Sequence, residues 1–120
     1  QLMTKYSEEG NTEGLKWIDA QTSHFSKLIN INKYKIPHMG WNTLTVQKEN
    51  KLIDPDINKN FYFVHSYYVE CANKDDILTQ TRYDKIFVSS FKKDNIYGFQ
   101  FHPEKSHKQG LSIIENFARV

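Results

Sequence analysis

The segment His102-Pro103-Glu104 places an imidazole and a carboxylate two residues apart, after an apolar run. Such a pair can perform general acid–base catalysis, because the carboxylate fixes the tautomer of the ring and stabilises its protonated form. Pro103 restricts His102 to an extended backbone, and side chains two residues apart on a strand point the same way. Both side chains could therefore stand together at a strand end. From this spacing alone, an exposed pair in an ordinary turn is the favoured interpretation.

Two other kinds of site deserve testing against the sequence. A metal site would bring Glu104 together with the histidines His38, His65, His102 and His107. Their spacings match no zinc signature, and Cys71 lacks a Cys-x-x-Cys partner. A nucleophilic thiol paired with His102 is the second possibility, but the neighbouring Glu70 disfavours the thiolate of Cys71. We expect no metal, and a packed or idle thiol.

Composition limits the class of protein. The chain has 120 residues, of which 38% are apolar, so we expect one domain with a small core, or an incomplete domain. Its 16 basic and 14 acidic residues are scattered, which argues against nucleic acid as a partner. No apolar run is long enough to cross a bilayer, so no membrane partner is expected. A single cysteine suits the cytoplasm.

The first half of the chain is expected to mix loops and strands. Apolar residues within 1–6 fit the tail of a helix, and 7–14 is expected to be a polar loop. Residues 15–25 are predicted to form a strand. Pro37 and Gly40 predict a turn between two extended pieces, the second at about 41–46.

The second half carries stronger strand signals. Residues 61–69 are aromatic or β-branched at nearly every position, which predicts a strand buried on both faces. Residues 77–83 and 86–101 predict three more strands, with Lys92–Asn95 as a hairpin turn. Ser106 begins a capping-box pattern, and a helix with an apolar face is expected to follow, comprising Leu111, Ile114, Phe117 and Ala118.

Three segments carry a family resemblance: Pro-His-Met-Gly-Trp-Asn at 37–42, Tyr-Phe-Val-His-Ser-Tyr-Tyr at 62–68, and Gly-Phe-Gln-Phe-His-Pro-Glu-Lys-Ser at 98–106. Together, and in this order, they resemble the glutamine amidotransferase subunits of imidazole glycerol phosphate synthases, which belong to the triad class of glutamine amidotransferases. Gln1 resembles the glutamine that ends the Cys-x-Gly-x-Gln nucleophile elbow of that family. The chain therefore looks like the C-terminal portion of a longer subunit.

The resemblance implies a function in which His102 and Glu104 are two members of a Cys-His-Glu triad that hydrolyses glutamine to glutamate and ammonia. The cysteine nucleophile would precede Gln1, so the 120 residues alone are expected to be inactive. Four residues match positions that hold the amino-acid end of the substrate glutamine: Gln1, Glu9, Ser66 and Tyr67. The resemblance implies no cofactor and no metal.

The resemblance also implies a partner. Ammonia would pass to a synthase subunit, expected to be a (β/α)8 barrel in a heterodimer, that makes imidazole glycerol phosphate in histidine biosynthesis. Five residues match positions on the partner face: His38, Trp41, Asn42, Tyr62 and Lys105. His65 lies in a family motif as a structural residue. Large aromatic rings suit an interface, although Trp41 and Tyr62 fit a core equally well.

The fold implied is α/β, with a twisted mixed sheet flanked by helices. Residues 1–120 would form the C-terminal part of a single glutamine amidotransferase domain, without its first βα units. Two other functions stay open. One is a related glutaminase that supplies ammonia to a synthase amidating a sugar or a surface polysaccharide. The other is a non-catalytic docking module of the same fold.

Overall fold

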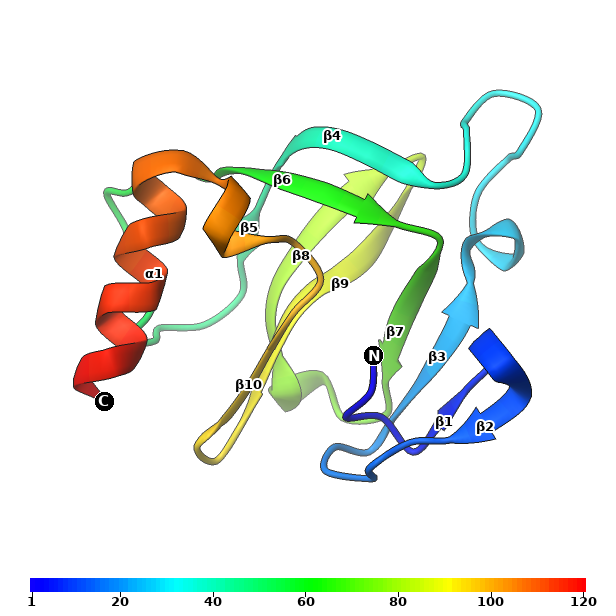
Figure 1. Cartoon of the computed structure of the whole chain (residues 1–120), viewed down its shortest axis with the longest axis horizontal. Coiled ribbons are helices and arrows are strands. Elements are labelled where there is room, and N and C mark those ends of the chain that lie inside the picture. Colours follow the sequence, from blue (N-terminus) through cyan, green and yellow to red (C-terminus); the bar gives the residue numbers. More distant parts are fainter.

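A computed structural model describes all residues from 1 to 120 (Figure 1). The strands are β1 (Tyr6–Ser7), β2 (Thr12–Glu13), β3 (Ala20–His24), β4 (His38–Thr43), β5 (Thr45–Val46), β6 (Asn60–His65), β7 (Tyr67–Cys71), β8 (Ile77–Tyr83), β9 (Lys85–Lys93) and β10 (Ile96–Phe99). Four short 3-10 helices are η1 (Glu9–Asn11), η2 (Phe25–Lys27), η3 (Lys74–Asp76) and η4 (Pro103–Lys105). The single α-helix is α1 (His107–Arg119). No helix is long and apolar enough to span a membrane.

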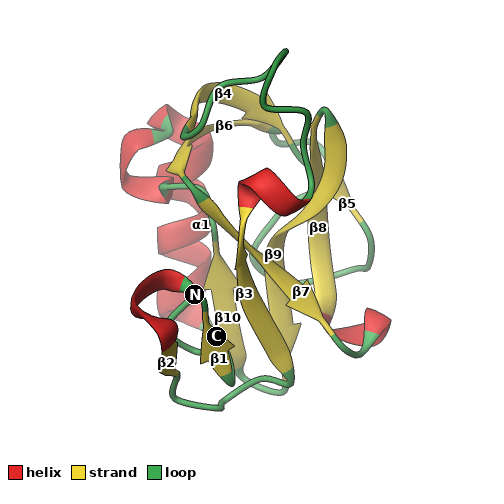
Figure 2. Ribbon diagram, turned by 90° about the vertical axis from the view of Figure 1, so that its right-hand side faces the viewer, coloured by secondary structure: helices red, strands yellow, loops and turns green.

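Eight strands form one mixed sheet in the order β2-β1-β3-β7-β9-β8-β5, with β10 paired to β9. The pair β1–β3 is parallel and the other pairs are antiparallel. β4 and β6 form a separate two-stranded ribbon, which crosses one end of the sheet (Figures 1 and 2). The expectation of an α/β fold with a mixed sheet is confirmed, with one α-helix in these residues.

The prediction of one strand over 61–69, buried on both faces, was wrong. A bend at Ser66 divides it, so that β6 pairs with β4 in the ribbon while β7 enters the large sheet. Burial alternates along β6, where Phe61 and Phe63 are fully buried and Tyr62 lies half-exposed between them. The sequence hid this alternation because tyrosine and valine occupy the outward positions.

Predictions for the first half were wrong in detail. Residues 1–6 form turns and the start of β1 rather than the tail of a helix, because the Lys5 N–H bonds to the carbonyl of Ala20 and draws the segment onto β3. The loop expected at 7–14 contains η1 and β2, and only Ala20–His24 of residues 15–25 is a strand. β4 continues through Gly40, which adopts a φ of 124°, so the predicted turn there is absent. The predicted strand at 41–46 is interrupted at Leu44.

The last third was predicted more closely. The β9–β10 hairpin and α1 are confirmed. The buried side of α1 differs from the prediction, because Ile113 is 1% exposed whereas Leu111, Ile114 and Phe117 are 54%, 45% and 54% exposed. The capping box is also absent, since Ser106 makes no side-chain cap. Its hydroxyl instead bonds to backbone groups of His102 and Tyr62.

Aromatic rings fill the space between the large sheet, the ribbon and α1. Phe25, Phe63 and Phe87 meet there, with ring centroids of Phe25 and Phe87 5.2 Å apart and those of Phe63 and Phe87 5.9 Å apart. Burial of such rings is the largest favourable contribution to folding. A smaller cluster around Ile18, Val69 and Phe91 lies apart from it. The ribbon is thereby fixed on the sheet, and it positions the site described next.

Candidate active site

His102 and Glu104 form a direct contact, which their spacing allowed. Nδ1 of His102 lies 2.8 Å from Oε1 of Glu104. The backbone route differs from an ideal strand: His102 is extended, with φ −102° and ψ 97°, and Pro103 then begins the single turn η4. This turn brings the carboxylate of Glu104 next to Nδ1 of the His102 ring. The side chains are 36% and 58% exposed, so the pair is accessible to a substrate.

The location of the proton follows from the carboxylate. Desolvation raises the pKa of Glu104, but hydrogen bonds from its own backbone N–H and from His102 outweigh it, so the pKa lies below its ordinary value. An ionised carboxylate only accepts, so Nδ1 of His102 carries the proton and Nε2 keeps its lone pair. The ring is thus oriented to act as a base through Nε2.

Ser106 anchors this segment to the ribbon. Its buried hydroxyl donates to the carbonyl of His102 at 2.6 Å and accepts from the N–H of Tyr62 at 3.0 Å. The N–H of His102 in turn donates to the carbonyl of Tyr62 at 2.9 Å. α1 approaches closely enough that a Cβ on Gly110 would lie 1.8 Å from the carbonyl oxygen of Pro103. The position of His102 is therefore set by β6 on one side and by α1 on the other.

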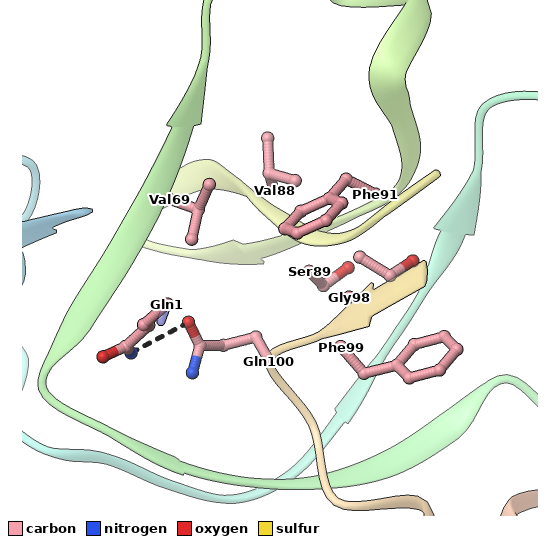
Figure 3. A pocket seen from close by; sticks show the side chains of 9 residues that line it. Gln1, Val69, Val88, Ser89, Phe91, Gly98, Phe99 and Gln100 are labelled. Atoms are coloured by element: carbon pink, nitrogen blue, oxygen red, sulfur yellow. Dashed lines mark hydrogen bonds between the residues drawn. The ribbon is translucent and has the colours of Figure 1, made fainter. Parts of the chain in front are cut away.

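The side-chain amide of Gln1 joins two distant segments of the chain. Its Nε2 donates to the carbonyl of Tyr67 at 3.3 Å and to Oε1 of Gln100 at 3.2 Å. Figure 3 shows the second of these bonds among the side chains that line a crevice of about 10 Å³, which is room for about one water molecule. Gln100 precedes His102 by two residues, which span at most about 7 Å. Gln1 and Tyr67 are thus joined to the segment that leads into the candidate base.

Glu9 and Gln1 line the same open hollow, which has a volume of about 360 Å³. η1, which carries Glu9, is held against β3 by the preceding Glu8. The carboxylate of Glu8 accepts from the N–H of His24 at 3.0 Å and pairs with Lys27 at 2.5 Å. The Lys27 ammonium, and then this N–H, hold the pKa of Glu8 below its ordinary value. Two acidic residues, Glu9 and Glu13, thus line the hollow together with Gln1.

Ser66 lies at the bend between β6 and β7, half-buried, next to Tyr67. Its carbonyl accepts from the N–H of Phe25 at 2.9 Å, which fixes the bend on η2. The four residues predicted to hold glutamine therefore come from the N-terminal segment, η1 and this bend. Hydrogen bonds or a shared hollow connect Gln1 with Tyr67 and with Glu9, and Ser66 is placed by its chain neighbour.

The residues predicted for a partner face occupy the ribbon and η4. Trp41 lies opposite Tyr62 in register, with ring centroids 5.9 Å apart, and its ring stacks on His107 at 4.9 Å. Trp41 is 43% exposed, and Lys105 is also exposed. Asn42 is half-buried on the opposite side of the strand.

His38 differs from the other predicted partner residues because its ring is buried beneath the ribbon, 3% exposed. Its Nδ1 lies 3.0 Å from Nε2 of His65, and Nδ1 of His65 lies 2.7 Å from the carbonyl of Tyr67. Burial lowers the pKa of His38 to about 4. Burial also lowers the pKa of His65 to about 3, with further contributions from His38 and His102. Both rings are therefore neutral near pH 7.

Cys71 is remote from this arrangement. It ends β7, four residues beyond Tyr67, which is about 13 Å along a strand. Burial, and then the charge of Asp76, raise the pKa of its thiol to about 11. At neutral pH this thiol is protonated, so it is a poor nucleophile. No group of three or more His, Cys, Asp or Glu side chains is arranged to hold a metal ion.

Three contributors to the site escaped the sequence analysis: Ser106, Gln100 and Gly110. Its sequence context suggested that Ser106 caps a helix. In the structure its hydroxyl instead bonds to Tyr62, which lies 44 residues earlier in the sequence, so no local pattern could reveal it. Gln100 carries no local signal beyond lying two residues before His102. A glycine within a helix was the one available clue for Gly110, because glycine disfavours helices and is kept where backbone approaches closely.

The chain is similar in sequence to a protein family and to several named proteins. All of residues 1–120 match the family model described as glutamine amidotransferase class-I. The chain is 56% identical over 119 residues to imidazole glycerol phosphate synthase subunit HisH 2 of Methanococcus maripaludis, covering 98% of this chain and 57% of that protein. It is 43% identical over 122 residues to the HisH 2 subunit of Pseudomonas aeruginosa, covering 100% and 58%, and 42% identical over 121 residues to the HisH subunit of Leptospira borgpetersenii, covering 100% and 59%. The chain thus spans less than three fifths of the length of these relatives.

Proposed function

The chain belongs to the class-I glutamine amidotransferase family, and on that premise we propose that it is the C-terminal part of a glutaminase domain that supplies ammonia to a synthase subunit. The resemblance carried by the three sequence segments is thereby confirmed. We propose that this synthase makes imidazole glycerol phosphate in histidine biosynthesis. The support is that relatives at 42–56% identity are named as imidazole glycerol phosphate synthase subunits. We place the reaction in the cytoplasm.

The observation that carries this proposal is the 2.8 Å contact between His102 and Glu104. In the proposed reaction a cysteine thiol gives its proton to Nε2 of His102, and its sulfur attacks the side-chain amide carbon of glutamine. The protonated ring then returns the proton to the amide nitrogen, so that ammonia leaves and a thioester remains. Water, deprotonated by the same nitrogen, releases glutamate and the thiol. Glu104 orients the ring and stabilises its positive charge throughout.

Substrate glutamine is proposed to bind with its amino-acid end in the hollow beside Gln1. The carboxylate of Glu9 suits the α-ammonium group, and so does Oε1 of Gln1, because both N–H groups of that amide already donate to Tyr67 and Gln100. Ser66 and Tyr67 add polar groups at the bend that borders Gln1. The side-chain amide of the substrate would then point toward His102.

The nucleophile is proposed to be a cysteine other than Cys71. The thiol of Cys71 has a pKa of about 11 and lies at the far end of β7. We therefore assign the nucleophile to a segment of the domain outside residues 1–120. The synthase partner, proposed to be a (β/α)8 barrel, would dock on Trp41, Asn42, Tyr62 and Lys105, with His38 beneath them.

A glutaminase assay of the full-length protein tests the proposal. Glutamate and ammonia are measured with and without the synthase subunit, and His102→Ala is the control. Turnover that the partner increases and that His102→Ala abolishes is the expected result. Residues 1–120 alone are expected to release no ammonia above the His102→Ala background. Turnover by those residues, or full activity of His102→Ala, contradicts the assignment.

A further inference from the structure

The two buried histidines have no part in the proposed reaction, yet they lie in an aromatic cage. The ring of His38 is sandwiched between Tyr83 and Phe63, with centroid distances of 4.1 and 4.9 Å. The ring of His65 lies 4.9 Å from that of Phe25. Burying polar nitrogens among such rings is unfavourable unless each nitrogen is hydrogen-bonded.

Hydrogen-bond chemistry fixes the direction of every bond in this cluster. The carbonyl of Tyr67 only accepts, so Nδ1 of His65 carries a proton. The neutral ring of His65 then accepts at Nε2, which makes Nδ1 of His38 the donor. Nε2 of His38 is left as an acceptor, and it faces Nδ2 of Asn42 at 3.3 Å.

The Asn42 end of this chain is fixed as well. Nδ2 of Asn42 also donates to the carbonyl of Arg82 at 2.9 Å, and its Oδ1 accepts from the N–H of Thr43 at 2.8 Å. The amide therefore cannot flip without losing bonds. One ordered sequence of donors runs from Asn42 through His38 and His65 to the carbonyl of Tyr67, and no second arrangement satisfies all the atoms.

The two ends of the chain lie at different proposed sites. Asn42 follows Trp41 on β4, the strand of the proposed partner face. The carbonyl of Tyr67 also accepts from Nε2 of Gln1, a residue proposed to hold glutamine. A displacement of β4 therefore changes the hydrogen bonding of a carbonyl that helps to position Gln1.

We propose that His38 and His65 are positioning residues that couple the β4–β6 ribbon to the glutamine site through the carbonyl of Tyr67. The glutamine end of this inference rests on the proposed function. The lowered pKa values of both histidines keep the rings neutral, as the bond directions require. Coupling between two sites typically changes affinity by about 5- to 150-fold, and we expect a change of about tenfold here.

The first test needs no enzyme activity. Nitrogen chemical shifts of the full-length protein are expected to show Nδ1-protonated neutral rings at His38 and His65. Asn42→Leu is expected to shift the carbonyl carbon resonance of Tyr67, and His38→Phe is expected to abolish that response while keeping the stacking. Tyr83→Phe is the matched control, because it removes a hydroxyl bond to Lys35 beside the same ring without entering the chain of bonds. An unchanged response in His38→Phe, or Nε2-protonated rings, overturns the inference.

The second test uses glutamine hydrolysis by the full-length protein with its synthase. His38→Phe is expected to raise the KM for glutamine about tenfold in the presence of the partner, with a smaller change in kcat. His38→Gln, whose amide offers an N–H group to donate and an oxygen to accept, is expected to recover most of the loss, and Tyr83→Phe is expected to match the wild type. Equal effects of His38→Phe and Tyr83→Phe would indicate packing alone and overturn the inference. A wild-type protein without turnover refutes the proposed function, and the chemical shifts then decide the coupling by themselves.

Discussion

Replacing Gly110 by alanine should lower the activity of the candidate base His102, although Gly110 does not contact the His102 ring. A Cβ at this position would lie 1.8 Å from the carbonyl oxygen of Pro103 and 2.7 Å from its carbon. Ordinary van der Waals contact begins at 3.4 Å, so the oxygen would have to move by about 1.6 Å. Both atoms belong to the backbone between His102 and Glu104, which cannot rotate away as a flexible side chain could.

The size of the effect follows from that displacement. A shift of about 1.6 Å exceeds what the 2.8 Å contact of His102 with Glu104, or the 2.6 Å bond from Ser106, can absorb. A misplacement of about 1 Å in a catalytic group can lower a rate about 10²-fold. We expect Gly110→Ala to lower kcat of the full-length glutaminase by about 10²-fold, and overpacking to destabilise the fold by about 1–3 kcal/mol.

Urea unfolding and steady-state kinetics at saturating glutamine separate the two effects. Ile113→Val on the same helix is the control, because it should destabilise the fold by about 1 kcal/mol without moving Pro103. The control is expected to keep its kcat within about twofold of the wild type. A folded Gly110→Ala protein with wild-type kcat would refute the claim that α1 positions His102.

Three further predictions concern single groups. Glu104→Gln should lower kcat by about 10²-fold, because the neutral amide no longer stabilises the protonated ring of His102. Glu115→Gln, on the exposed side of α1, should leave kcat unchanged. Equal kcat values for both variants would exclude Glu104 from the mechanism. Stability should fall as pH is lowered from 6.5, because burial lowers the pKa of His38 to about 4 and of His65 to about 3, so the unfolded chain binds more protons in that window. Urea midpoints measured between pH 7.5 and 4 check this, and His38→Phe should flatten the slope. Cys71→Ala should leave turnover within about twofold of the wild type, given a thiol pKa of about 11, and loss of activity on this change would make Cys71 the nucleophile after all.

Local patterns explain which structural predictions succeeded. The β9–β10 hairpin follows from two apolar runs around a polar turn, and the contact of His102 with Glu104 follows from two residues held by the proline between them. Such features depend on steric rules that act over a few residues. The prediction failed for the single strand at 61–69, because pairing with β4 on one side of Ser66 and with β3 on the other is decided by segments far away in the sequence.

The sequence by itself determined the pairing of acid and imidazole, the last strands, the helix after Ser106 and, through three motifs, the family. Tertiary structure alone decided that Gln1 meets the carbonyl of Tyr67, that His38 meets His65, and that α1 turns Ile113 inward. The physical reason is the distance along the sequence over which each kind of interaction acts. Dihedral preferences act between neighbours, whereas these contacts join segments that only the packing of the aromatic core brings together.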